Sequence, residues 1–329
     1  MNAPRTRVQR RPVHGVLLLD KPLGLSSNNA LQKCKWLLRA EKAGHTGTLD
    51  PLATGVLPLC FGAATKFSQL QLEADKTYEA TIRLGVKTST GDAEGEIIEE
   101  RPVAQITAAR LDEVAHQFTG ALRQLPPMHS ALKKDGKPLY EYARAGEEVE
   151  REVRDVIVKS LRLSLIPGIS HEISLLATVS KGTYIRTLGE DIAQALGCGG
   201  HLVSLRRIAT GDFEISQCTT LDALEALSEA DRLTRLAPVD SLLPDHHHVT
   251  LDAENAGRFL SGLRRRGDWR DNECVAVYGP SGEPPSQPTP SGGRGEFTLL
   301  GTAHIKGGEL IPGRLLSPVE IEQILESKT

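Results

Sequence analysis

The chain has 329 residues, which exceeds the usual size of a single domain, so one large and one small domain are expected. Its 39 Lys and Arg residues face 42 Asp and Glu residues, so a globally basic nucleic-acid binder is excluded and any nucleic-acid site must be a local cluster of basic side chains. The five cysteines form no Cys-x-x-Cys pair, which argues against structural zinc and favours a reducing, cytoplasmic compartment.

The first twelve residues are predicted to form a flexible basic tail. Four arginines occur there without an acidic residue, and no apolar segment follows that could make a signal peptide. No apolar run approaches the ~20 residues that a membrane span requires. We therefore expect the folded part to begin near Val13 and to contain no membrane segment.

Three elements are expected in the first part of the chain. Residues 13–19 are β-branched or leucine-rich and predict a buried strand that ends in a turn. A helix should follow, capped by Ser26 or Ser27, because apolar residues recur at helical spacing as far as position 38. Residues 76–84 alternate with period two, which predicts a strand with Tyr78 on its core side.

The middle of the chain mixes helices and strands. Two amphipathic helices are expected, at residues 107–118 and 138–145, and two neighbouring strands, at residues 153–165 and 171–180. Between the helices, residues 124–137 are rich in Pro, Gly and Lys and predict a long functional loop. Because no regular βαβ rhythm occurs, the sequence indicates an α+β domain.

After about residue 245 the character of the sequence changes. A short helix is expected at residues 252–260 and strands at 273–278 and 297–306. Residues 279–295 consist mostly of Pro, Gly and Ser, so this loop should be mobile. The consecutive histidines at 246–248 suggest a metal site, but neighbours in sequence cannot all face one ion, and a linker is the better interpretation.

A turn crowded with glycine and threonine carries a single carboxylate, in the sequence Gly-His-Thr-Gly-Thr-Leu-Asp-Pro-Leu-Ala-Thr-Gly-Val-Leu at residues 44–57. Asp50 precedes Pro51 and is therefore pushed out of the α region, and the glycines allow positive φ and close approach by another chain. Asp-Pro is also an ordinary turn starter. A nucleotide-binding glycine loop is excluded, because neither Gly-x-x-x-x-Gly-Lys-Ser/Thr nor Gly-x-Gly-x-x-Gly occurs in the required context.

Four ordered motifs resemble those of the bacterial TruB family of tRNA pseudouridine synthases. They are residues 15–28, the Asp50 motif at 45–57, the Lys-Thr-Tyr at 76–78 and the Gly-Thr-Tyr-Ile-Arg-Thr-Leu at 182–188. The resemblance implies a mixed, mainly antiparallel sheet with flanking helices at residues 13–245, carrying an RNA-binding insertion at about 124–152. It also implies a small C-terminal RNA-binding β domain of the PUA type at residues 246–329.

The resemblance further implies that the protein converts uridine 55 in the T loop of tRNA to pseudouridine after flipping the base out of its stack. Asp50 would be the nucleophile, with attack at C1′ or at C6 left open. His45 would stack against the disturbed loop, Tyr78 on the target uracil, and Tyr184 on its other side, with a role in proton transfer. The backbone of Leu205 would meet the base. No cofactor, metal or obligate protein partner is implied; the partner is the tRNA T stem-loop.

A cation is needed beside Asp50, because a buried carboxylate otherwise becomes neutral. Arg186 is the candidate, since an extended segment at residues 182–186 would place it on the same face as Tyr184. A surface arginine paired with Glu190 or Asp191 is the alternative. Candidate phosphate contacts, each of which could equally be a solvated surface charge, are Lys21, Lys133, Lys134, Lys137, Arg144, Arg206 and Arg207.

Two other functions remain open at this stage. The protein could bind tRNA and help it to fold without modifying it, or it could be a guide-RNA-dependent pseudouridine synthase, which the TruB family closely resembles. Replacement of Asp50 separates an enzyme from a folding chaperone, because only catalysis needs the carboxylate. Activity of the purified chain on a bare T stem-loop separates a stand-alone enzyme from one that requires a guide.

Overall fold

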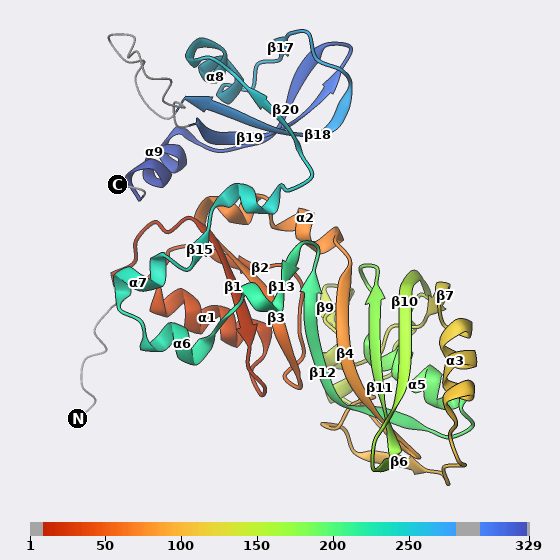
Figure 1. Ribbon diagram of the computed structural model, residues 1–329. Helices are drawn as coiled ribbons and strands as arrows, with labels where there is room; N and C mark the ends of the chain where they lie inside the picture. Colours follow the sequence, from red (N-terminus) through yellow and green to blue (C-terminus); the bar gives the residue numbers. More distant parts are fainter. Residues whose placement is uncertain (1–8, 281–296, 328–329) are drawn as a thin grey trace, which may run out of the picture.

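The computed structural model describes residues 9–280 and 297–327, and within these residues it contains an eleven-stranded sheet and a five-stranded sheet (Figure 1). The main path of the large sheet runs β14 (Thr219–Thr220), β1 (Gly15–Lys21), β3 (Ala53–Phe61), β12 (Gly200–Thr210), β4 (Lys76–Leu84), β11 (Ile169–Val179), β10 (Arg154–Ile166), β7 (Gly120–Gln124). Neighbouring strands of this sheet are antiparallel except β1 with β14 and β3 with β12. Short strands β2 (Ala43–His45), β13 (Phe213–Glu214) and β15 (Leu236–Ala237) flank this path.

One face of the large sheet is covered and carries the main core. In β4 the residues that alternate inward from Tyr78 to Leu84 are buried, while Glu79 and Arg83 on the other face are exposed, as the period-two pattern predicted. Helices α1 (Ser27–Leu37), α3 (Ala108–Gln117) and α5 (Ile185–Ala195) contribute their apolar faces to this core. The predicted mixed, mainly antiparallel α+β fold is confirmed.

The expected helix starts are confirmed by their caps. The Ser26 side chain accepts a hydrogen bond from the N–H of Asn29 at the start of α1, and Thr107 accepts one from Arg110 at the start of α3. Strand β1 runs two residues beyond its expected end and therefore includes Lys21, which is fully buried.

Residues 182–186 are not extended throughout, so the condition under which Arg186 was expected to share a face with Tyr184 is not met. Gly182 turns the chain at φ +77°, and helix α5 begins at Ile185. Apolar residues at Ile185, Leu188 and Ile192 follow helical spacing and bury one face of α5. Arg186 is therefore a first-turn helical residue.

The region of the expected insertion lies between β7 and β10. It contains a two-residue ladder, β8 (Lys133–Lys134) with β9 (Lys137–Pro138), followed by helix α4 (Leu139–Arg144). The predicted helix at 138–145 is confirmed, and the residues before it form a loop interrupted only by this small ladder. A second small hairpin, β5 (Val86–Thr88) with β6 (Ile97–Glu100), precedes α3.

The end of the expected N-terminal tail is held against the protein. The backbone N–H of Arg11 donates to the carbonyl of Arg39, the Arg10 guanidinium donates to the carbonyl of Ala40, and Arg11 lies 3.2 Å from the carboxylate of Glu229. The flexible tail therefore does not extend to residue 12 as expected, while its first eight residues lie outside the described part of the chain.

The C-terminal sheet begins at residue 247. Its strands run β16 (His247–Thr250), β18 (Asn272–Pro280), β19 (Phe297–Lys306), β20 (Glu309–Leu315), β17 (Arg265–Arg266), and helices α8 (Ala253–Leu260) and α9 (Pro318–Glu326) accompany them. The predicted helix and both predicted strands are confirmed, as is a small C-terminal β domain. The predicted mobile loop at 279–295 lies, apart from its first two residues, outside the described residues.

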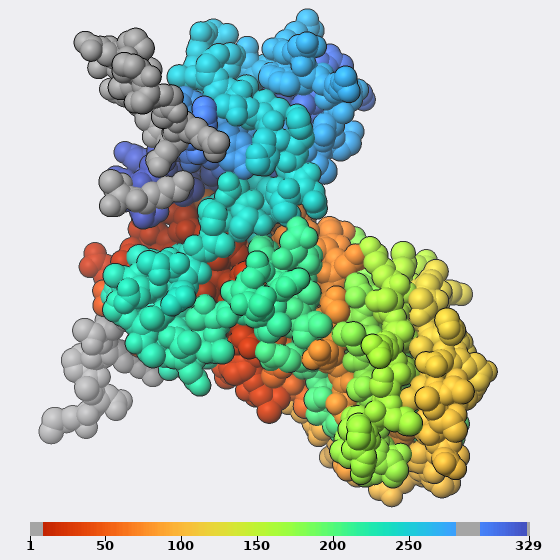
Figure 2. Space-filling view, viewed as in Figure 1, coloured from red at the N-terminus to blue at the C-terminus, as the bar shows by residue number. Residues whose placement is uncertain are grey.

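The two sheets meet through a shared apolar cluster. In Figure 2 the blue C-terminal lobe meets the red and teal part of the chain and stands apart from the yellow and green residues of about 100–180. In Figure 1, helix α2 (Ser68–Glu73) is drawn in orange, and helices α6 (Leu221–Ala226) and α7 (Glu229–Leu233) are drawn in teal. The cluster joins Val16, Leu18, Val56, Phe67, Phe213, Val239, Leu242 and Leu243 to Ala276, Leu299 and Leu316.

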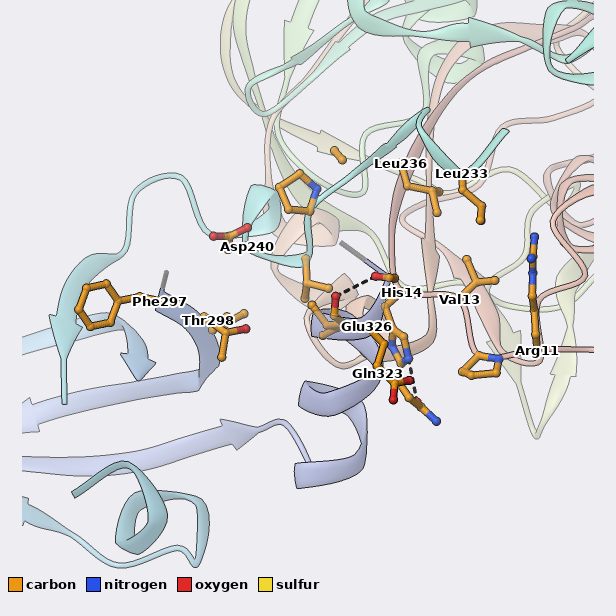
Figure 3. Close-up of a pocket in the computed structure, with 17 residues that line it drawn as sticks. Arg11, Val13, His14, Leu233, Leu236, Asp240, Phe297, Thr298, Gln323 and Glu326 are labelled. Carbon is orange, nitrogen blue, oxygen red and sulfur yellow. Dashed lines mark hydrogen bonds between the residues drawn. The ribbon is translucent and has the colours of Figure 1, made fainter. Parts of the chain in front are cut away.

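Hydrogen bonds between side chains also join the two sheets at this junction, among them those of His14 and Tyr278. The N–H of Ala63 donates to His14 Nδ1, so His14 carries its proton on Nε2 and donates it to Gln323 Oε1 at 3.0 Å (Figure 3). The hydroxyl of Tyr278 in β18 donates to the carboxylate of Asp240 at 3.2 Å. The C-terminal sheet is thus fixed against the large sheet by polar contacts as well as by apolar burial.

Candidate active site

Asp50 lies in the tight connection between β2 and β3. The Ser27 hydroxyl accepts a hydrogen bond from the N–H of Leu49 at 2.7 Å and donates one to its carbonyl at 3.0 Å, which fixes the backbone beside Asp50 to helix α1. Gly55 has φ +99°, and a Cβ there would lie 2.1 Å from the carbonyl oxygen of Arg207. Only glycine therefore permits β3 to pair this closely with β12.

The cation predicted beside Asp50 is present. Arg186 Nη2 lies 2.9 Å from Asp50 Oδ2, and the arginine is only 5% exposed. The alternative of a surface arginine paired with Glu190 or Asp191 is excluded, because no ion pair joins either residue to Arg186 and the guanidinium is enclosed.

The Arg186 guanidinium is held by further groups. Its Nη1 donates to the carbonyl of Thr90 at 2.9 Å and lies 3.6 Å from the carboxylate of Asp92, while Nη2 also donates to the carbonyl of His129 at 2.7 Å. Asp92 is itself fixed, since Thr90 Oγ1 and the N–H of Glu94 donate to it. Contacts with both Nη1 and Nη2 therefore fix the orientation of Arg186 toward Asp50.

Burial and charge act in opposite directions on Asp50. Burial raises its pKa above the ordinary value of 3.8, and the charge of Asp92 raises it further, while Arg186 and Lys21 lower it. The net direction is upward, so the two cations only partly offset the cost of burying the carboxylate.

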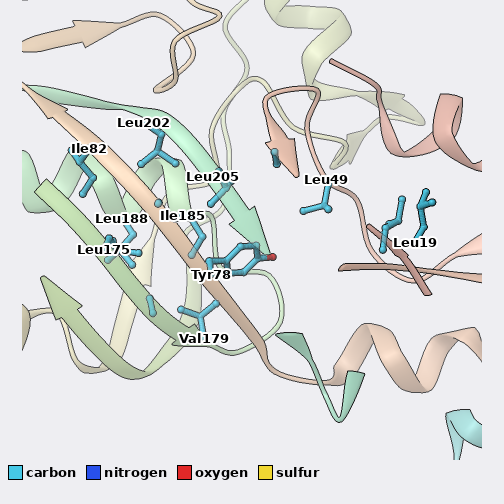
Figure 4. Close-up of a cluster of buried hydrophobic side chains, with 14 of the residues drawn as sticks. Leu19, Leu49, Tyr78, Ile82, Leu175, Val179, Ile185, Leu188, Leu202 and Leu205 are labelled. Atoms are coloured by element: carbon cyan, nitrogen blue, oxygen red, sulfur yellow. The ribbon is translucent and has the colours of Figure 1, made fainter. Parts of the chain in front are cut away.

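A cavity opens beside this ion pair and brings most of the predicted residues together. Tyr78 enters it from β4, Leu205 from β12 and Tyr184 from the residue before α5; Figure 4 shows Tyr78 among Val179, Ile185 and Leu205. The other lining residues are Gly47, Thr48, Leu49, Asp50, Ala53, Leu72, Lys76, Ser130, Ala131, Leu132, Ser180, Gly182, Thr183, Arg186 and Arg207.

The cavity offers an apolar slot with one acidic end. Tyr78 and Leu205 are each 8% exposed; the Tyr78 ring supplies a flat surface and Leu205 an apolar one. Burial raises the pKa of Tyr184, so its phenol is held neutral and can donate a hydrogen bond. A flat heterocycle with polar edges fits between these side chains. Asp50 would then lie beside the chemical group to which the ring is bonded.

His45 lies in β2, five residues before Asp50, and is not among the residues that line the cavity. Burial lowers the pKa of its imidazole, and its Nδ1 has no hydrogen-bond partner. The ring is therefore held neutral, which is compatible with stacking. Its predicted contact with a displaced loop stays a prediction.

Lys21 was predicted as an ion-pair partner or a phosphate contact, and the phosphate role is contradicted. Its side chain is fully buried, and Nζ donates to the carbonyls of Pro22 and Leu25. Burial lowers the pKa of Lys21 to about 8, with Asp50 acting in the opposite direction. Lys21 thus acts on the site through charge, without reaching the surface.

The remaining phosphate candidates divide by exposure. Arg207 is 1% exposed and donates from Nε to the carbonyl of Val56, but it lines the cavity and its Nη2 has no hydrogen-bond partner, so it belongs to the cavity wall and not to the outer surface. Arg206 pairs with Asp20 at 2.8 Å. The basic residues of the insertion remain candidates because they lie at or near the surface: Lys133, Lys134, Lys137 and Arg144.

The sequence analysis did not identify two residues of the site, Asp92 and Gln124. Asp92 lies in an irregular loop after β5, and only the tertiary fold places it behind Arg186. Gln124, at the end of β7, hydrogen-bonds the backbone of Tyr184 from 60 residues away. The apolar residues that follow Asp92, Ile97 and Ile98, are exposed, so no pattern of buried apolar residues in the sequence marked its position.

Within residues 9–280 and 297–327, no group of three or more His, Cys, Asp or Glu side chains is placed to hold a metal ion. His248, one of the three adjacent histidines, packs its ring against Tyr278 at 4.9 Å. In the same residues, no helix combines the length and the apolar character needed to cross a membrane.

Solved structures share this fold. A structure of an H/ACA RNP bound to a substrate RNA containing 2′-deoxyuridine matches with a TM-score of 0.65 at 21% identity, over 94% of this chain and 86% of the other. A Cbf5-Nop10-Gar1 complex matches with a TM-score of 0.65 at 22% identity, over 98% of this chain and 93% of the other. At these identities the likeness shows the fold alone.

Curated relatives are much closer in sequence. A tRNA pseudouridine synthase B of Verminephrobacter eiseniae is 61% identical over 99% of this chain and 96% of its own length, and one of Ralstonia nicotianae is 55% identical over 93% and 95%. The family model described as the N-terminal domain of TruB family pseudouridylate synthase matches residues 35–185, and that of the tRNA pseudouridylate synthase B C-terminal domain matches residues 186–244. By family model and by near-full-length identity, this chain belongs to the TruB family of pseudouridylate synthases.

Proposed function

We propose that this protein isomerises a uridine of tRNA to pseudouridine, and that its target is uridine 55 of the T loop. The observation that carries the proposal is the Asp50–Arg186 ion pair at the end of a cavity walled by Tyr78, Tyr184 and Leu205. The relatives that match nearly the whole chain are named tRNA pseudouridine synthase B, which supports the same reaction.

The reaction breaks the bond between ribose C1′ and N1 of uracil, turns the base and joins C5 to C1′, with the C5 proton lost and one returned to N1. Nothing is oxidised, so the balance requires no redox cofactor. Asp50 acts as the nucleophile, at C1′ or at C6 of the base, and this needs the ionised carboxylate that Arg186 favours. Tyr78 stacks on the uracil and keeps the freed base in place.

Tyr184 has a narrower role than the sequence suggested. Because burial keeps its phenol neutral, Tyr184 donates a hydrogen bond to the base more readily than it accepts a proton from C5. Its predicted part in proton transfer stays a prediction. The buried leucine, Leu205, supplies apolar surface and its backbone at the edge of the cavity.

Recognition of tRNA falls to surfaces around the cavity. We assign residues 13–245 to the catalytic domain and 246–329 to a PUA-like RNA-binding domain, with residues 124–152 as an RNA-binding insertion. The insertion supports this role because it carries Lys133 and Arg144 at the surface and because His129 contacts the active-site arginine. A cytoplasmic location also stays a prediction.

Incubation of the purified chain with a T stem-loop transcript, followed by mapping of pseudouridine, tests the proposal. Product at position 55 of the bare hairpin supports a stand-alone synthase, whereas product only with an added guide RNA favours the guide-dependent alternative. Asp50→Asn should abolish product and leave tRNA affinity within about threefold. Retained turnover in this variant would contradict the assignment of Asp50, and accelerated tRNA folding without any product would favour the chaperone alternative.

A further inference from the structure

The side chain of Gln124 forms two hydrogen bonds with the backbone of Tyr184. The N–H of Tyr184 donates to Gln124 Oε1 at 3.0 Å, and Gln124 Nε2 donates to the carbonyl of Tyr184 at 3.2 Å. Rotation of the carboxamide by 180° would set its NH₂ against the N–H of Tyr184, so the pairing defines its orientation. Gln124 is 3% exposed and Tyr184 is half-buried, so both hydrogen bonds are partly shielded from water.

Tyr184 needs this support because of its place in the chain. It is the N-cap residue of α5, where the backbone N–H has no acceptor within the helix, and its own side chain makes no capping hydrogen bond. The residues before it turn through Gly182 at φ +77°, so the preceding strand ladder does not fix Tyr184 either. Gln124 supplies the missing acceptor from a different strand.

The same glutamine begins the insertion that contacts Arg186. Gln124 ends β7, and the carbonyl of His129, five residues later, accepts a hydrogen bond from the Arg186 guanidinium at 2.7 Å. The start of the insertion is therefore attached to the site at two points, at Tyr184 and at Arg186, which is two residues further along α5.

We infer that Gln124 is a positioning residue for pseudouridine formation: its carboxamide fixes the backbone from which Tyr184 enters the cavity, and so sets the phenol against the nucleotide at Asp50. The inference rests on the proposed function. Gln124 itself does not line the cavity, so it acts only through Tyr184. An isosteric change that removes both hydrogen bonds leaves a buried N–H without a partner and frees the tyrosine to shift.

The test uses the full chain with Gln124→Leu, which keeps the size of the side chain, and Gln117→Leu on the exposed face of α3 as the matched control. Three quantities are measured: the single-turnover rate at saturating T stem-loop, the Kd for that RNA, and the thermal midpoint. We expect Gln124→Leu to lower the rate about 10- to 100-fold with Kd within about threefold, and the control to stay within about twofold of the wild type. An unchanged rate, or a loss confined to Kd, overturns the inference.

A double-mutant cycle separates positioning from a general weakening of the fold. In a Tyr184→Leu background the ring is gone, so adding Gln124→Leu should lower the rate by less than about threefold further. Full additivity of the two losses would show that Gln124 acts by another route.

A second variant decides the matter if Gln124→Leu does not fold. Gln124→Glu keeps an acceptor for the N–H of Tyr184 but sets a carboxylate oxygen against its carbonyl, and protonation restores the missing donor. Its single-turnover rate relative to the wild type should therefore rise as the pH falls from about 8 to about 6, because burial raises the pKa of a carboxyl group. A ratio independent of pH overturns the inference. A wild-type chain that makes no pseudouridine would refute the proposed function itself, whereas an active wild type matched by both variants refutes only the role of Gln124.

Discussion

Asp92 and Arg186 face each other inside the protein, with 3.6 Å between the carboxylate Oδ2 and the guanidinium Nη1. Both residues are buried, at 2% and 5% exposure. Because the other nitrogen of the same guanidinium reaches Asp50 at 2.9 Å, one cation is shared between two carboxylates. The buried acid orients the arginine, and the arginine in turn orients the carboxylate that faces the cavity.

Asp92→Asn should therefore impair catalysis without a matching loss of RNA binding. The neutral amide keeps the volume of the side chain but removes the charge that holds Arg186, and we expect the single-turnover rate to fall about 10- to 100-fold with Kd within about threefold. Asp112→Asn, an exposed position on α3, is the control. A rate within twofold of the wild type would show that Arg186 keeps its orientation without the charge of Asp92.

The pH dependence of the reaction should reflect the burial of Asp50. Burial raises its pKa above 3.8, and only the ionised form is nucleophilic, so the rate should decline as the pH falls through this raised pKa, earlier than for an exposed aspartate. Single-turnover rates at saturating RNA, measured from pH 8 downward, give the position of this acid limb. A rate that stays constant to the range of an ordinary aspartate would mean that Arg186 fully compensates for burial.

The acid limb should also move in the Asp92→Asn variant. The negative charge of Asp92 raises the pKa of Asp50, so its removal should shift the limb to lower pH even as the maximal rate falls. A shift to higher pH would indicate instead that Arg186 has left Asp50.

The sequence predicted those features that depend on local pattern. Alternation placed Tyr78 on the buried side of β4, and serine and threonine marked the starts of α1 and α3. The need of a buried carboxylate for a cation, together with family resemblance, identified Arg186. These conclusions held because each rests on a period, a cap or an electrostatic requirement readable within one or two segments.

Other features could not be read in this way. The shared face of Tyr184 and Arg186 depended on an extended segment at residues 182–186, but the apolar spacing from Ile185 onward is helical. Lys21 was predicted as an ion-pair partner or a phosphate contact, yet β1 carries it into the interior, since strand ends are poorly defined by sequence. Asp92 lies in a loop without periodicity, and only the packing of that loop against α5 brings it to Arg186.

Lys21→Met should stabilise the protein and weaken the enzyme. Burial lowers the pKa of Lys21 to about 8 in the folded state, whereas the unfolded value is 10.5, so the unfolded chain binds more protons between these values and the penalty for the buried charge disappears as the pH rises through this window. Below pH 8 the methionine variant should be more stable by about 1–3 kcal/mol, less the lost hydrogen bonds of Nζ.

Chemical denaturation of the wild type and Lys21→Met at pH 7 and at pH 10 measures this difference, which should shrink at the higher pH. The same variant should show a lower rate with the acid limb moved to higher pH, because Lys21 lowers the pKa of Asp50. A variant less stable than the wild type at pH 7 would show that the contacts of Nζ with the carbonyls of Pro22 and Leu25 outweigh the cost of burial.

Glu320→Gln should loosen the C-terminal sheet from the large one. Lys66 Nζ lies 2.6 Å from Glu320 Oε2 and donates to the carbonyl of Leu315 at 2.9 Å, and the N–H of Ser317 donates to the same carboxylate oxygen at 2.7 Å. Burial acts to raise the pKa of Glu320, but the hydrogen bonds from Lys66 and Ser317 outweigh it, and the folded pKa lies below 4.5. A depressed carboxyl pKa contributes stability above the unfolded value, and this is lost as the pH falls through the folded value.

The variant should therefore reduce the free energy of unfolding of the C-terminal domain by about 1–2 kcal/mol at pH 7, and the difference from the wild type should diminish as the pH falls below the ordinary value of 4.5 and through the lowered folded pKa. Fluorescence of Trp269 during urea denaturation, in a Trp36→Phe background that removes the exposed tryptophan of α1, reports on this domain. Glu322→Gln, on an exposed position of α9, is the control and should change little. Equal effects of the two substitutions would mean that the Lys66–Glu320 pair adds nothing to the apolar contacts at the junction.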